Sequence, residues 1–112
     1  MLVKVAGREA LRQLLAAHRG VVLQFSASWC GPCRVLHPTV EAAARRHPQL
    51  KFLSADVDEQ PQLADDHSVS SIPATFLYLD GAERQRLTGS DPERFNAAVT
   101  ALAKALQPST PH

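Results

Sequence analysis

The chain has two cysteines, Cys30 and Cys33, which are separated by Gly31 and Pro32 and preceded by Trp29. A Cys-x-x-Cys pair suits thiol–disulfide exchange, because a first thiolate attacks a disulfide sulfur and a second thiol displaces the resulting mixed disulfide. Two intervening residues place the two sulfur atoms within bonding reach. The glycine permits a tight turn, and the proline suits the first turn of a helix. The spacing therefore predicts Cys30 as the nucleophile and Cys33 as the resolving thiol.

The segments around the pair predict how it is positioned. Residues 21–27 are apolar and typical of a buried strand, and residues 34–47 are rich in Ala and Arg and favour a helix. This places Cys30 near a helix N-terminus, where unpaired N–H groups and the helix dipole favour an anion. We therefore expect Cys30 to ionise more readily than a free cysteine.

Two other interpretations of the cysteine pair are weaker. A structural disulfide across so short a loop contributes little through chain entropy. A zinc site could use His37, four residues after Cys33, but the chain has no second cysteine pair to complete the ligand shell. We therefore expect no metal and no cofactor other than a redox-active Cys30–Cys33 disulfide.

The elements that position the pair follow an alternating order. Pro38 should kink the helix after the cysteines, and Gly20 is expected to cap the helix before the first central strand. Asp80-Gly81 is a hairpin signal, and Asp91 before Pro92 resembles a helix start. The order β-α-β-α-β-α-β-β-α predicts an α/β fold, a mixed central sheet covered by helices on both faces. The expected strands are 2–5, 21–27, 51–57, 74–79 and 83–88, and the expected helices are 8–18, 34–47, 61–67 and 92–106.

Composition excludes several function classes. The chain has 112 residues and a net charge of +1, with no cluster of basic residues that would mark a nucleic-acid surface. It has no apolar run long enough to span a bilayer and no secretory signal, so we expect a cytoplasmic protein without membrane contact. Residues 1–107 are expected to form one domain and residues 108–112 a flexible tail.

The segment from Phe25 to Cys33 resembles the active-site segment of thioredoxins. Pro38 occupies the position of the family's kinking proline, residues 52–58 are similar to its central strand, and residues 69–73 resemble the segment that carries its cis-proline. Asp80-Gly81 and Gly89 match its later turn glycines. The resemblance covers residues 3–106 and implies the thioredoxin fold and the activity of a protein-disulfide reductase.

The resemblance also implies a role for each matching position. Ile72-Pro73 should form a cis peptide facing the cysteines, with the backbone near Ile72 available to an extended substrate. Trp29 would flank the nucleophile, and Gly89 and Ser90 would line the far side of the groove. The partners implied are protein disulfides and a flavoprotein reductase that restores the dithiol. We expect a monomer.

Gln24 departs from the family pattern, because thioredoxins usually carry a buried aspartate at this position, six residues before the first cysteine. That aspartate is thought to help remove the proton of the resolving cysteine. An amide cannot accept a proton near neutral pH, although it can hold a water that relays one. We therefore expect either slower release of the mixed disulfide or a gain in stability from the missing buried charge. Ser54, in the same interior layer, also replaces a charged residue.

Gln24 gives weight to an alternative function, a thioredoxin-fold binding module with weak or secondary redox activity. A second alternative is an oxidase or isomerase of an oxidising compartment, but Gly31-Pro32 resembles the reducing members. The other polar residues predict no site. His18, His37, His47 and His67 are expected to be surface or partly packed side chains, and the acidic residues 56–59 a solvated strand end.

Overall fold

A computed structural model describes residues 1–107 as a five-stranded sheet with four helices. The strands lie in the order β1-β3-β2-β4-β5. β1, β3 and β2 are parallel to one another, whereas β4 runs antiparallel to β2 and β5 antiparallel to β4. The predicted mixed α/β architecture is therefore confirmed. The strands are β1 Leu2–Lys4, β2 Gly20–Ser26, β3 Lys51–Asp56, β4 Ala74–Leu79 and β5 Ala82–Thr88.

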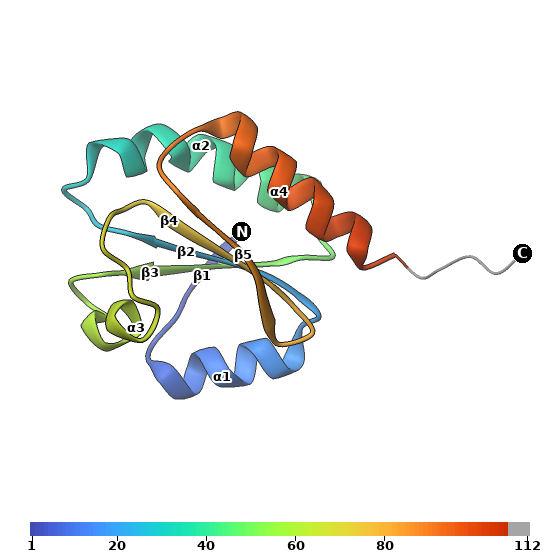
Figure 1. Ribbon diagram of the computed structural model, residues 1–112, viewed down its shortest axis with the longest axis horizontal. Helices are drawn as coiled ribbons and strands as arrows, with labels where there is room; N and C mark the ends of the chain where they lie inside the picture. Colours follow the sequence, from blue (N-terminus) through green and yellow to red (C-terminus); the bar gives the residue numbers. More distant parts are fainter. Residues whose placement is uncertain (108–112) are drawn as a thin grey trace, which may run out of the picture.

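Helices cover both faces of the sheet (Figure 1). α2 (Gly31–Arg46) and α4 (Pro92–Ala105) lie on one face, and α1 (Arg8–Ala17) and α3 (Pro61–Asp66) lie on the other. Two apolar clusters form, one on each face, because side chains of a strand alternate between its two sides. Val22 of β2 packs with Phe95 under α2 and α4, while its neighbour Leu23 packs with Leu63 on the opposite face.

One helix start and one hairpin turn follow the sequence pattern. The Asp91 side chain accepts hydrogen bonds from the N–H groups of Glu93 and Arg94 and caps α4, as predicted. Asp80 and Gly81 both have positive φ, 52° and 84°, so they form the tight turn predicted between β4 and β5. The sequence is sufficient to predict this cap and this turn, because each depends only on adjacent residues.

The predicted cap at Gly20 is wrong. α1 ends at Ala17 with His18 as its C-cap, and Gly20 is the buried first residue of β2. A side chain at Gly20 would meet Leu50 and Leu106, because an added Cβ would lie 2.5 Å from Leu50 Cδ2 and 2.8 Å from Leu106 Cδ1. This glycine therefore leaves room for the ends of the Leu50 and Leu106 side chains between β2 and the end of α4, and it does not terminate a helix.

In residues 1–107, no helix is both long and apolar enough to cross a bilayer. The predicted tail, residues 108–112, lies outside the described part of the chain.

Candidate active site

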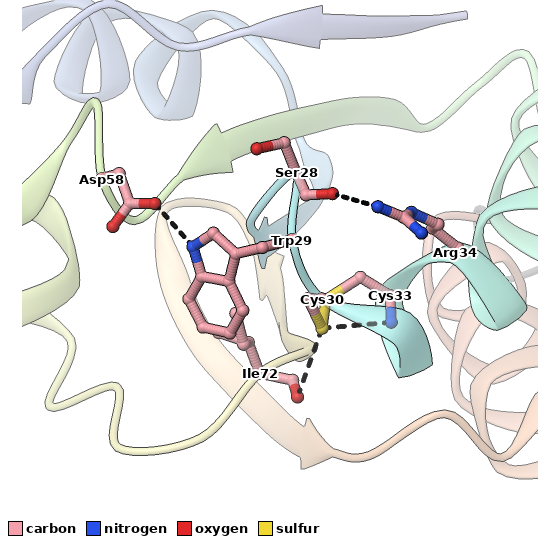
Figure 2. Close-up of a disulfide and its surroundings, with 7 residues drawn as sticks. All are labelled: Ser28, Trp29, Cys30, Cys33, Arg34, Asp58 and Ile72. Atoms are coloured by element: carbon pink, nitrogen blue, oxygen red, sulfur yellow. Dashed lines mark hydrogen bonds between the residues drawn. A yellow bond between two sulfur atoms is a disulfide. The ribbon is translucent and has the colours of Figure 1, made fainter.

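The cysteine pair lies at the junction between the end of β2 and the start of α2 (Figure 2). Cys30 and Cys33 form a disulfide with a Cα–Cα distance of 5.3 Å, inside the usual range for such bonds. Cys30 is the N-cap of α2, and Gly31 and Pro32 open the helix. The Cys33 N–H donates to Cys30 Sγ over 3.2 Å. A thiolate at Cys30 would therefore receive an N–H donor and the positive end of the helix dipole.

Apolar residues surround both sulfur atoms. Cys30 is 4% exposed and Cys33 is 8% exposed, and they cluster with Ala27, Val57 and Ile72. Both cysteines are therefore largely covered by the start of α2 and by the loops that carry Val57 and Ile72.

The loop before β4 forms the opposite wall of the site. Ile72-Pro73 is a cis peptide, as the resemblance implied, and Ile72 O lies 3.9 Å from Cys30 Sγ. The Gly89 N–H donates to Pro73 O over 3.0 Å, and Gly89 has a φ of 95° that favours glycine. The structure therefore brings Ile72, Pro73 and Gly89 together beside the cysteines.

Trp29 lies on the outer side of the pair and is 65% exposed. Figure 2 shows its indole turned toward Asp58, whose Oδ2 accepts a hydrogen bond from Trp29 Nε1 over 2.7 Å. The sequence predicts a solvated strand end for Asp58 and does not reveal this contact. Chain spacing gave no signal for it, because the two residues meet only through the pairing of β2 with β3.

A row of polar residues crosses the sheet beneath Cys33. Gln24 at the centre of β2 pairs with Ser54 of β3 on one side and with Thr75 of β4 on the other. Residues paired in this way present their side chains to the same face. Gln24 is 6% exposed and Thr75 is 1% exposed. The sequence points to Gln24 and Ser54 but not to Thr75, because only the strand register places Thr75 in this row.

The Gln24 side chain reaches an open cavity of about 610 Å³ that also contacts Cys33. Among residues 1–107, no protein group hydrogen-bonds the Gln24 amide. Every fully buried side-chain nitrogen or oxygen in the same range has a partner, so the Gln24 amide end is not fully enclosed. The amide is therefore available to water in this cavity, and the role of Gln24 as a water-holding group stays a prediction.

The remaining predicted residues lie on α2 and the turn before it. Pro38 is exposed inside α2, four residues after Arg34. Arg34 donates to the Ser28 carbonyl over 2.8 Å and so fastens the first turn of α2 to the end of the strand (Figure 2). In the described part of the chain, no group of three or more His, Cys, Asp or Glu residues is arranged to hold a metal ion.

Comparison with known proteins agrees with this geometry. The family model for thioredoxin matches residues 2–101. A thioredoxin of Chlamydia trachomatis is 40% identical over 88 residues, which cover 79% of this chain and 85% of the relative. Thioredoxin-1 of Saccharomyces cerevisiae is 35% identical over 89 residues, which cover 80% of this chain and 86% of the relative.

Solved structures give the same result. The X-ray structure of Fasciola hepatica thioredoxin superposes with a TM-score of 0.87 at 32% identity and covers 90% of this chain and 99% of that one. Oxidised mitochondrial thioredoxin 3 of Saccharomyces cerevisiae superposes with a TM-score of 0.87 at 28% identity, with 90% and 95% covered. The disulfide-capable pair at the start of α2 and these relationships support one activity, reduction of protein disulfides. The chain belongs to the thioredoxin family and is a thiol–disulfide oxidoreductase with the thioredoxin fold.

Proposed function

We propose that Cys30 and Cys33 reduce protein disulfides in a two-step cycle. The Cys30 thiolate attacks one sulfur of the substrate disulfide, which forms a mixed disulfide and releases the first substrate thiolate. Cys33 loses its proton and attacks Cys30 Sγ, which closes the Cys30–Cys33 disulfide and releases the second substrate thiol. Two electrons thus pass from the protein dithiol to the substrate. The observation that carries this assignment is the Cys33 N–H donated to Cys30 Sγ at the N-cap of α2.

The substrate-binding surface is proposed to run from Trp29 across Ile72-Pro73 to Gly89. An extended substrate strand could hydrogen-bond the backbone near Ile72, as in other cases where a strand joins an exposed edge. The support is geometric, since Ile72 O lies 3.9 Å from Cys30 Sγ and Gly89 is held against Pro73. Trp29 offers exposed aromatic surface at the entrance.

We further propose the protein's setting in the cell. Protein disulfides are its substrates, a flavoprotein reductase of the thioredoxin reductase type restores the dithiol, and the protein works in the cytoplasm as a single-domain monomer over residues 1–107. The Gly31-Pro32 dipeptide supports the reducing direction. Few large apolar side chains are exposed among the described residues, namely Met1, Trp29 and Val35, which supports the monomer.

Insulin reduction tests the proposed cycle. Dithiothreitol reduces insulin disulfides slowly, and the B chain then precipitates, so turbidity reports the rate. The wild-type protein should accelerate precipitation, and Cys30→Ser should abolish the acceleration. An unaccelerated reaction from folded wild-type protein would instead favour the binding module, and Cys30→Ser retaining partner binding would support that alternative further.

A further inference from the structure

Release of the mixed disulfide requires a group that accepts the proton of Cys33. Gln24 occupies the position beneath Cys33 and carries an amide, which does not accept a proton near neutral pH. Its neighbours in the polar row, Ser54 and Thr75, each carry a hydroxyl group. A hydroxyl group is an equally poor base at this pH. The proton of the Cys33 thiol must therefore pass to a group outside this polar row.

The open cavity beside Cys33 provides that route. Its walls include Cys33 and Gln24 on the inner side and His37 and Glu41 of α2 on the outer side. Its volume of about 610 Å³ is large enough for several water molecules, and Gln24, Ser26 and Ser54 give them polar partners. A chain of water can thus connect the Cys33 thiol to the histidine.

Helix geometry places His37 on the same side of α2 as Cys33. The two residues are four apart, which stacks their side chains one turn above each other. His37 Nε2 lies 2.8 Å from Glu41 Oε1, so in the neutral ring Nε2–H donates to the carboxylate and Nδ1 carries the free lone pair. The Glu41 carboxylate, four residues further along the helix, thus holds the ring in the orientation that leaves Nδ1 free to take a proton.

On the basis of the proposed Cys30–Cys33 cycle, we propose that His37, positioned by Glu41, accepts the Cys33 proton through water in this cavity. The Cys33 S–H bond breaks and its proton moves through water to His37 Nδ1. The resulting thiolate attacks Cys30 Sγ, the bond between Cys30 and the substrate sulfur breaks, and the departing thiolate takes a proton from solvent. The imidazolium then loses its proton to solvent.

Other charged groups face the same cavity. Lys4 of β1 and Arg34 and Arg45 of α2 line it, and so does Met1, which carries the α-amino group. Glu41 is the one carboxylate among the lining residues, and its contact with His37 Nε2 leaves His37 Nδ1 free to accept a proton.

A pH-jump experiment isolates the release step. The reduced protein is mixed with a small aliphatic disulfide at acidic pH, where Cys33 stays protonated and the mixed disulfide on Cys30 accumulates. A jump to a series of higher pH values starts release, and acid quenching with mass spectrometry follows loss of the adduct. Cys33→Ser should keep the adduct, which establishes that Cys33 performs the release.

His37→Ala should slow release about tenfold or more near neutral pH, within the range for general base catalysis. It should also change the pH profile of release, because the proposed proton acceptor is gone. Added imidazole should restore the rate of this variant, because the cavity is open to small molecules. His47→Ala is the matched control, since His47 follows the last residue of the same helix and does not line the cavity.

The outcomes separate this inference from the proposed function. Release from His37→Ala at the wild-type rate at every pH would overturn the role of His37 while leaving the Cys30–Cys33 cycle intact. A slower variant that imidazole does not restore, with an unchanged pH profile, would show a structural effect only and would also overturn it. Loss of the adduct from Cys33→Ser at the wild-type rate would instead overturn the proposed cycle itself.

Discussion

At the scale of single residues, Gln24 keeps the buried position beneath Cys33 uncharged. It is 6% exposed at the centre of the sheet, and its amide carries no charge into that position. In Gln24→Asp, burial would raise the pKa of the new carboxyl above its ordinary value near 4, because the charged form is poorly solvated there. The folded state would then hold a proton that the unfolded state has lost.

Gln24→Asp should therefore lose stability as pH rises above about 4, since the unfolded state releases its proton first. We expect a free energy of unfolding about 1–4 kcal/mol below that of the wild type at pH 8, measured by urea titration. The new carboxylate should also speed release of the mixed disulfide, and it should do so most clearly in the His37→Ala background. Gln24→Asn, which stays uncharged, is the control. Equal release rates for the aspartate and asparagine variants would contradict this account.

Tyr78 and His67 form a second polar contact inside an aromatic cluster. His67 Nδ1 lies 2.8 Å from Leu63 O and its Nε2 lies 2.7 Å from the Tyr78 hydroxyl, while the ring packs against Phe25 and Phe76. The sequence predicts a surface or partly packed histidine, and His67 is partly packed. Burial, followed by the nearby charge of Glu83, raises the pKa of Tyr78 to about 12.

The chain has one tyrosine, so its absorbance titration reports Tyr78 alone. We expect the folded protein to titrate near pH 12 and the denatured protein near pH 10. The folded pKa is the higher one, so this group contributes stability fully below about pH 10 and loses the contribution as pH rises toward 12. A native titration near pH 10 without unfolding would show that the hydroxyl is not buried as described.

Tyr78→Phe tests the hydrogen bond itself. The variant keeps the ring but leaves His67 Nε2 without its partner, which should cost about 1–2 kcal/mol of unfolding free energy near neutral pH. Insulin reduction should continue, because Tyr78 lies in the cluster under α1 and α3 and not beside the cysteines. A variant as stable as the wild type would mean that solvent replaces the lost hydroxyl.

At the scale of elements, Gly20 leaves the space that the Leu50 and Leu106 side chains occupy between β2 and the end of α4. Gly20→Ala should reduce the free energy of unfolding by about 1–2 kcal/mol, because the added methyl group forces Leu50 and Leu106 to move. Gly31→Ala is the matched control for stability, since no atom lies within 4 Å of its added Cβ and its φ is not positive. Equal chemical denaturation midpoints for the two variants would contradict the close-packing explanation.

Elements were predictable from sequence where a local signal defines them. The Asp91 cap and the Asp80-Gly81 turn each depend on two or three adjacent residues, and both were correctly predicted. The error at Gly20 arose because a glycine after a helix commonly serves as its cap, whereas here packing against distant residues requires it. Thr75 and Asp58 were missed for the same reason, since strand register and strand pairing bring them to the site.

At the scale of the whole molecule, two ion pairs join segments that are distant in sequence. Arg8 of α1 makes a two-point contact with Asp66 at the end of α3, both distances being 2.7 Å. Arg19, between α1 and β2, makes a similar contact with Asp80 in the hairpin turn, at 2.8 and 3.2 Å. Charge patterning along the chain could not predict either pair, because 58 and 61 residues separate the partners.

These pairs should make the fold sensitive to acid. The hydrogen bond from each arginine, together with its positive charge, lowers the pKa of Asp66 and of Asp80 below the ordinary value near 4. A lowered folded pKa means that the contribution is fully present above about pH 4 and is lost as pH falls through the folded value. Both pairs are exposed, so the effect should be modest and should shrink at high salt.

The double variant Asp66→Asn/Asp80→Asn should therefore show a weaker decline in unfolding free energy than the wild type as pH is lowered from about 5 to about 2. Urea titrations at several pH values in low salt measure this slope. Glu9→Gln is a comparison variant: the pKa of Glu9 is also lowered by its contact with Arg12, so removing this single pair within α1 should weaken the decline too, but by less than removing both distant pairs. A parallel decline of the double variant and the wild type would show that the two ion pairs do not stabilise the fold. Packing of the two apolar clusters would then alone hold α1, α3 and the hairpin turn together.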